Sequence, residues 1–92
     1  MNDIKNKTFR LKVKTTVSKI GENAILLDLN SGTYFELNEV ALIIINNLND
    51  FISFNSIKEV VVNNFEVDDD KSEQDILVFL QKLIEMNFLD IK

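Results

Sequence analysis

The residues that come closest to a chemical site are the acids between positions 66 and 70. Asp68, Asp69 and Asp70 follow one another, and Glu66 stands two residues before them. A calcium-binding EF-hand loop needs oxygen ligands at alternate positions, a central Gly and a Glu at its twelfth position, and this segment lacks that pattern. Consecutive acids just before an apolar periodic segment are typical of a helix start. We therefore expect no metal site here.

Two residue types that carry much of enzyme chemistry are missing. The 92 residues include no His, the commonest general base, and no Cys, the thiol nucleophile and frequent zinc ligand. Gly21 and Gly32 are isolated, so the chain has no glycine-rich phosphate loop. We expect a protein that is not an enzyme and that uses neither a metal nor a cofactor.

The composition is that of a single folded domain. Hydrophobic residues make up 46% of the chain and charged residues 27%, which is ordinary for a globular protein. The longest apolar run, Val40 to Ile45, is far shorter than the roughly 20 residues that cross a bilayer, and the N-terminus lacks the apolar segment of a secretion signal. We expect a cytoplasmic protein with no membrane partner.

Basic side chains gather at the N-terminus, while the remainder of the chain is acidic. Apolar and basic residues alternate along residues 9–14, which predicts a strand with two different faces. Its apolar face would hold Phe9, Leu11 and Val13, and its basic face Arg10, Lys12 and Lys14. The basic face is either a solvated surface or an electrostatic docking strip for an acidic peptide or enzyme surface.

The order of apolar patterns predicts an α+β fold, namely a small winged helix-turn-helix with a three-stranded antiparallel sheet followed by three helices. The expected strands cover residues 9–14, 24–29 and 33–37, and the expected helices cover about 39–49, 57–65 and 70–86. Gly32 suits the positive backbone angle of a short hairpin loop between the second and third strands.

Polar residues mark where each helix should begin. Asn38 is a good N-cap for the first helix, and Ser56 with Glu59 fits a capping box for the second. Asp68 and Asp70 are equally good starts for the third.

Two features of these elements suggest binding. The third strand is a plausible free edge, which a folded protein either protects or uses, so a peptide added as a further strand is the first possibility. The third helix is apolar beyond the expected core stripe, as in a helix that lines a groove. The stripe holds Ile76, Phe79, Leu80, Leu83 and Asn87, and the surplus is Leu77, Val78, Ile84 and Met86. Most of the surplus could equally pack under neighbouring segments, but Val78 lies almost opposite the stripe.

Six segments in their order and spacing resemble a known family. They are residues 25–29 (Ile-Leu-Leu-Asp-Leu), 31–35 (Ser-Gly-Thr-Tyr-Phe), 37–38 (Leu-Asn), 56–59 (Ser-Ile-Lys-Glu), 67–68 (Val-Asp) and 75–83 (Asp-Ile-Leu-Val-Phe-Leu-Gln-Lys-Leu). Over residues 9–91 the chain is similar to the PqqD-like family, the leader-peptide recognition domains of pathways that make ribosomally synthesised, post-translationally modified peptides. Asn87 stands where the family usually has Gly, and Asn also tolerates the left-handed conformation that ends a helix.

This resemblance implies a leader peptide that adds to the third strand and lies in a cleft closed by the third helix. The peptide-binding edge would be Thr33, Tyr34, Phe35 and Glu36. The groove wall would come from Asp75, Val78 and Lys82, or from the opposite flank with Leu77 and Gln81. Lys82 and the basic strip could attract an acidic leader, and Asp75 could pair with a basic leader residue.

The resemblance also implies a free-standing adaptor, with residues 1–8 as an N-terminal extension and residues 9–92 as the recognition domain. Its partner would be a separate modifying enzyme, such as a radical S-adenosylmethionine enzyme, or the leader peptidase of a lasso-peptide pathway. We expect a monomer or weak dimer without a cofactor.

Two other functions remain open at this point. A winged-helix DNA-binding regulator would need Lys or Arg along its recognition helix, whereas the second and third helices are mostly acidic, so we expect no nucleic-acid partner. A structural subunit would use its apolar surplus only to hold a partner protein or a second copy of itself.

Overall fold

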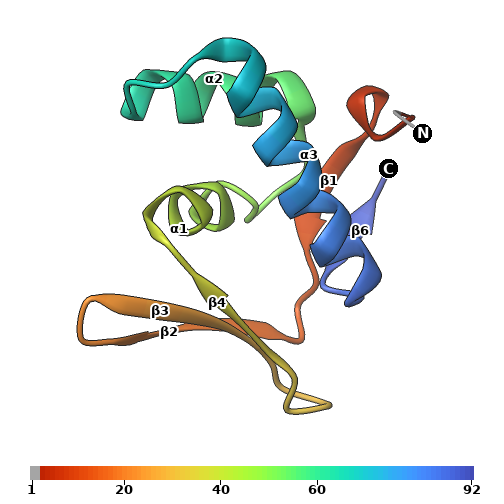
Figure 1. Cartoon of the computed structure of the whole chain (residues 1–92). Helices are drawn as coiled ribbons and strands as arrows, with labels where there is room; N and C mark the ends of the chain where they lie inside the picture. The colour runs from red at the N-terminus through yellow and green to blue at the C-terminus, as the bar shows by residue number, and fades with distance from the viewer. Residues whose placement is uncertain (1–2) are drawn as a thin grey trace.

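The computed structural model describes residues 3–92 (Figure 1). The first two residues of the predicted 1–8 extension lie outside the described residues. The elements are η1 (Asp3–Asn6), β1 (Thr8–Leu11), β2 (Thr15–Ile20), β3 (Asn23–Asp28), β4 (Tyr34–Leu37), α1 (Glu39–Asn46), β5 (Ile52–Ser53), α2 (Phe54–Asn64), α3 (Asp69–Glu85) and β6 (Leu89–Ile91). The α+β class is confirmed.

The strands form two separate antiparallel sheets, with orders β5-β1-β6 and β2-β3-β4. The prediction of a single three-stranded sheet that is completed before the first helix is therefore wrong. Strand β5 lies between α1 and α2, β6 follows α3, and both pair with β1. Figure 1 shows the β2-β3-β4 sheet on the far side of α1 from α2, and β1 beside β6.

The predicted first strand over residues 9–14 is confirmed only for residues 9–11, because β1 ends at Leu11. The Lys12 carbonyl accepts a hydrogen bond from the Thr15 backbone N–H at 3.1 Å and closes a turn. After this turn the chain enters the other sheet as β2. The strand is interrupted there although the alternation of apolar and basic residues continues, and Val13, predicted to face inward, is 98% exposed.

One hydrophobic core lies between the helices and the two sheets. Its most deeply buried large side chains are Phe9, Leu26, Ile44, Ile45, Leu48, Phe54, Ile57, Ile76, Leu80, Leu83 and Phe88. The predicted stripe of α3 is largely confirmed, because three of its members are buried and Phe79 packs partly against them. Asn87 is the exception, since it lies beyond the end of α3 and is exposed.

Three residues predicted to mark helix ends have that role in the structure. The Asn38 side chain caps α1 by accepting a hydrogen bond from the Ala41 backbone N–H at 2.8 Å. Of the two possible starts for α3, the structure uses Asp68, whose carboxylate accepts from the Lys71 N–H at 3.4 Å. Asn87 has a φ of 63°, the left-handed conformation expected after the helix.

The capping box at Ser56 is wrong, because α2 begins at Phe54 and its N-cap is Ser53. The Ser53 hydroxyl accepts a hydrogen bond from the Ser56 backbone N–H at 3.2 Å. Phe54, Ile57 and Val61 are all buried and share one helical face. Burial of Phe54 in the core therefore requires the helix to begin earlier than the local capping pattern indicated.

No helix among residues 3–92 combines the length and the apolar character that a membrane span requires.

Replacing Ser53 by Ala should lower the free energy of unfolding by about 1 kcal/mol, because the first turn of α2 loses its N-cap acceptor. Replacing Ser56 by Ala should cost less, since Ala keeps the backbone N–H that the cap binds and loses only an exposed hydrogen bond between the Ser53 and Ser56 hydroxyls, at 3.1 Å. Urea denaturation of both variants measures the difference. A larger loss from Ser56→Ala would restore the capping box predicted from the sequence.

Candidate functional site

Strand β4 leaves one of its edges open. Among the described strands it pairs only with β3, and the Asp28 N–H donates to the Thr33 carbonyl at 2.8 Å just before the strand begins. Hydrogen-bonded and non-hydrogen-bonded positions alternate in an antiparallel pair, so this bond directs the backbone groups of Phe35 toward β3. The backbone N–H and C=O groups of Tyr34 and Glu36 therefore point to the open side.

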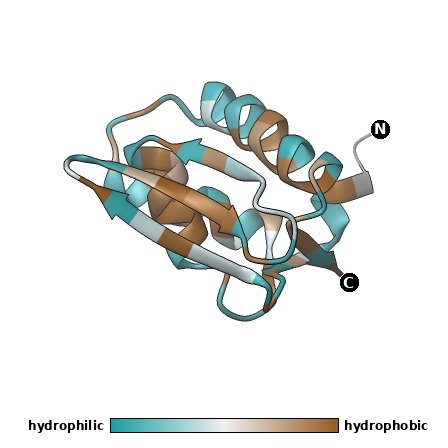
Figure 2. Ribbon diagram, turned by 90° about the horizontal axis from the view of Figure 1, so that it is seen from below, coloured by the Kyte–Doolittle hydropathy of each residue, from teal (hydrophilic) through white to brown (hydrophobic). Residues whose placement is uncertain are grey.

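A cleft of about 590 Å³ lies along this open edge, between β4, the start of α1 and α3. Figure 2 shows α3 beside the β4 edge of the sheet. The apolar side chains that line the cleft are Phe35, Leu37, Val40, Ala41, Ile44, Val78 and Phe79. Its polar and charged residues are Asn23, Glu36, Asn38, Asp75 and Lys82.

Two aromatic rings connect β4 to α3 at the cleft. The ring centroids of Phe35 and Phe79 are 5.8 Å apart, with an edge-to-face angle of 61°. Such pairs contribute about 0.5–1.5 kcal/mol beyond the burial of their area. Val78, the residue before Phe79, remains 58% exposed. The helix is thus held against the strand while an apolar side chain stays accessible beside the open edge.

Five of the residues predicted to bind a peptide lie together in this cleft: Phe35, Glu36, Asp75, Val78 and Lys82. The other four do not line it. Thr33 precedes β4, and Tyr34 lies on the opposite face of the sheet, where it lines a smaller hollow with Ile20 and Ile25. On α3, Leu77 packs against the core and Gln81 is exposed outside the cleft.

The contribution of α1 to the cleft was not predicted. Val40, Ala41 and Ile44 line the cleft, and none of them was among the predicted binding residues. Asn38 was identified as a cap, but nothing in the local pattern indicated that the helix it starts would close one end of a cleft. That arrangement arises from the packing of α1 against β4 and α2.

The predicted docking side chains Arg10, Lys12 and Lys14 all have partners within the chain. Arg10 forms an ion pair with Asp90 at 3.2 Å, and the Lys12 Nζ donates to the Asn87 side-chain oxygen at 2.7 Å. Lys14 pairs with a buried carboxylate at the end of β3. None of the three lines the cleft, and the basic residue that does line it is Lys82.

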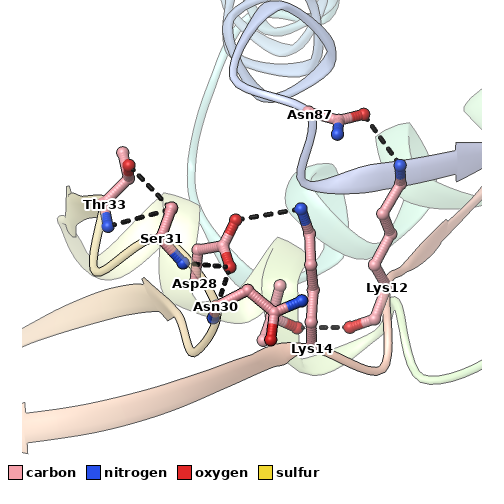
Figure 3. A network of polar contacts seen from close by, with 8 residues as sticks. Lys12, Lys14, Asp28, Asn30, Ser31, Thr33 and Asn87 are labelled. Carbon is pink, nitrogen blue, oxygen red and sulfur yellow. Dashed lines mark hydrogen bonds and ion pairs between the residues drawn. The ribbon is translucent and has the colours of Figure 1, made fainter.

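The buried carboxylate belongs to Asp28, which is 4% exposed (Figure 3). The Lys14 Nζ lies 3.0 Å from its Oδ2 atom, and the backbone N–H groups of Asn30 and Ser31 donate to Oδ1 at 2.9 and 3.3 Å. These donors, chiefly the Lys14 ammonium group, lower the pKa of Asp28 from 3.8 to about 2, although burial of the carboxylate acts in the opposite direction and raises it. The carboxylate holds the loop that leads into β4, in which Gly32 has the predicted positive φ.

No group of three or more acidic side chains among residues 3–92 is arranged to hold a metal ion. The chemistry that the cleft offers is hydrogen bonding along a strand edge, an apolar surface and fixed charges. These features suit non-covalent binding of an extended chain.

The Asp28→Asn variant should be less stable than the wild type at neutral pH, because the native carboxylate is held ionised by Lys14. Because the pKa of Asp28 is lower in the folded state than in the unfolded state, its ionised form stabilises the fold above pH 3.8. This contribution is lost as the pH falls from 3.8 toward about 2. The stability difference between wild type and variant should therefore shrink over that interval. Urea denaturation at several pH values measures it.

Lys14→Met serves as the control for this prediction. Removal of the ammonium group should raise the pKa of Asp28, which side-chain NMR can follow directly. Equal stability of wild type and Asp28→Asn at pH 7 would contradict the prediction.

Comparison with known proteins adds a family match and two structural matches. Residues 23–89 match the family model for coenzyme PQQ synthesis protein D (PqqD). The structure of TbiB1 in complex with the TbiA(beta) leader peptide is 26% identical, with a TM-score of 0.75 over 88% of this chain and 94% of that one. Lasso peptide synthetase B1 complexed with the leader peptide is 29% identical, with a TM-score of 0.74 over 89% and 96%. No curated protein matches the chain.

Proposed function

This chain belongs to the PqqD family, and we propose that it is a non-catalytic adaptor for a ribosomally made precursor peptide. It binds the leader segment of the precursor and delivers it to a separate tailoring enzyme or leader peptidase. The open edge of β4 along an apolar cleft is the observation that carries this proposal. Both similar structures are complexes with leader peptides, which supports it.

The leader binds by adding a strand to β4. The outward N–H and C=O groups of Tyr34 and Glu36 form main-chain hydrogen bonds with it, which are independent of the leader sequence. Every second leader side chain then points into the cleft, where the rings of Phe35 and Phe79 form an apolar surface. Main-chain bonds supply affinity in this mode, and the pockets for alternate side chains supply specificity.

The wall of the groove opposite β4 is the flank of α3 that carries Asp75, Val78 and Lys82. All three line the cleft, whereas Leu77 and Gln81 lie outside it. Arg10, Lys12 and Lys14 support the domain through their internal partners, and we assign the attraction of a charged leader to the side chains on α3.

We propose the leader peptidase of a lasso-peptide pathway as the partner, and the similarity to a lasso peptide synthetase supports a pathway of that kind. A radical S-adenosylmethionine enzyme is the alternative. We take residues 9–92 as the recognition domain and residues 1–8 as an extension. In that extension Lys5 forms an ion pair with Glu73 of α3. A precursor made on ribosomes meets its adaptor in the cytoplasm, which is where we place this protein.

Replacing Glu36 by Pro should weaken leader binding about tenfold or more, because Pro removes an outward N–H donor and places a ring on the open edge. The fold should survive, since Pro is tolerated on edge strands. Isothermal titration with the leader of a precursor encoded beside the gene, together with NMR shifts on β4 and α3, measures the effect.

Glu36→Ala is the matched control, because it removes the same carboxylate and keeps the N–H. Its affinity should stay within about threefold of the wild type. A folded Glu36→Pro variant that binds the leader as tightly as Glu36→Ala would exclude strand addition at β4.

Replacing Val78 by Asp should also weaken leader binding about tenfold, because it puts an unpaired charge on the apolar wall of the cleft. Gln81→Asp adds the same charge to the same helix outside the cleft, and should change the affinity by about twofold at most. The two dissociation constants, measured at one salt concentration, decide between the flanks. The reverse order of effects would assign the groove to the Leu77 and Gln81 flank.

A further inference from the structure

The groove wall on α3 carries one charge of each sign. Asp75 and Lys82 are seven residues apart, which is about two helical turns, and therefore lie on the same face about 10.5 Å apart along the axis. Val78 lies between them, and all three line the cleft. The wall thus presents an acid, an apolar side chain and a base in sequence along its length.

Both charges are available to a ligand. Lys82 forms no ion pair with any residue between 3 and 92. Within the described part of the chain, Asp75 pairs only with Lys71, one turn earlier, at 3.7 Å, and both side chains are more than half exposed. An exposed pair of this kind contributes little, so Asp75 can exchange it for a better-placed partner.

The direction of α3 relative to β4 gives the two charges fixed places along the strand edge. Figure 2 shows α3 and β4 running in opposite directions beside each other. Asp75 in the first half of α3 is therefore near the end of the cleft where β4 leads into α1. Lys82, near the end of α3, is close to the end of the cleft where β4 begins.

The spacing of these charges matches an extended peptide. A strand rises about 3.3 Å per residue and every second side chain faces the same way, so three cleft-facing positions, i, i+2 and i+4, span about 13 Å. This span is close to the separation of the two charges once the reach of the Lys82 side chain is included. The middle position faces Val78 and the rings of Phe35 and Phe79.

We propose that this protein selects leaders by the order of their charges. The preferred segment carries a basic, an apolar and an acidic side chain at alternate positions, with the base facing Asp75 and the acid facing Lys82. This inference rests on the proposed function, because it requires the leader to lie on β4. A segment with the opposite charge order would place like charges together at both ends, which disfavours it.

Selection from a random ten-residue peptide display library tests the proposal. Wild type should enrich peptides with a base and an acid four positions apart, in one order, around an apolar residue. The double variant Asp75→Lys, Lys82→Asp, which has the same net charge, should enrich the reverse order. Synthetic copies of a selected peptide and its charge-reversed twin should differ at least tenfold in Kd, with the preference inverted in the double variant.

Two further variants complete the design. The double variant Gln74→Lys, Gln81→Asp places a positive and a negative charge seven residues apart on α3, outside the cleft. It should select the same peptides as the wild type. Glu36→Pro should lose the enriched peptides, because the strand edge is blocked.

The outcomes separate this inference from the proposed function. Peptides that are enriched without a charge order, and that are lost with Glu36→Pro, would overturn the charge selection and leave leader binding intact. Peptides that bind Glu36→Pro as well as the wild type would overturn strand addition, and the charge order with it. No enrichment against the wild type would overturn both.

Discussion

The open edge of β4 depends on the hydrogen bonds and the ion pair that the Asp28 carboxylate forms. This carboxylate accepts hydrogen bonds from two backbone N–H groups of the loop that leads into β4, and Lys14 joins it to the turn between the two sheets. A strand that slips by one residue presents every side chain on the opposite face. Such a slip in β4 would remove Phe35 from the cleft and turn the outward groups of Tyr34 and Glu36 toward β3. A buried charge at the end of β3 thus determines which backbone groups β4 presents at its open edge.

An open edge next to a helix is a consequence of having two sheets. Strand β1 is occupied on both sides by β5 and β6, so it is not available to cover β4. Helix α3 lies beside β4 instead. It contacts the strand through the rings of Phe35 and Phe79, and the outward backbone groups of β4 remain unpaired among the described strands. The helix both restricts access to the edge, as folded proteins usually require, and provides the side chains that would distinguish one extended peptide from another.

Local patterns predicted much of this arrangement. The hairpin of β3 and β4, the Asn38 cap, the left-handed Asn87 and most of the buried stripe of α3 follow from spacing and from side-chain chemistry within a few residues. The same reasoning failed where distant segments decided the outcome. The alternation along residues 9–14 continues through a turn that leads from one sheet to the other. The Ser56 pattern was overruled by the burial of Phe54, which moved the start of α2 to follow Ser53.

The amino-acid sequence was enough to predict the α+β class, the family resemblance, the candidate edge at β4 and the exclusion of His and Cys chemistry, because periodicity, capping and composition need no knowledge of distant neighbours. The pairing of the strands, the flank of α3 that faces β4 and the availability of each basic side chain became known from the three-dimensional structure. Arg10, for example, pairs with Asp90, 80 residues away in the chain, and Lys14 with the buried Asp28. These outcomes depend on distances between segments that meet only after folding, so no local pattern contains them.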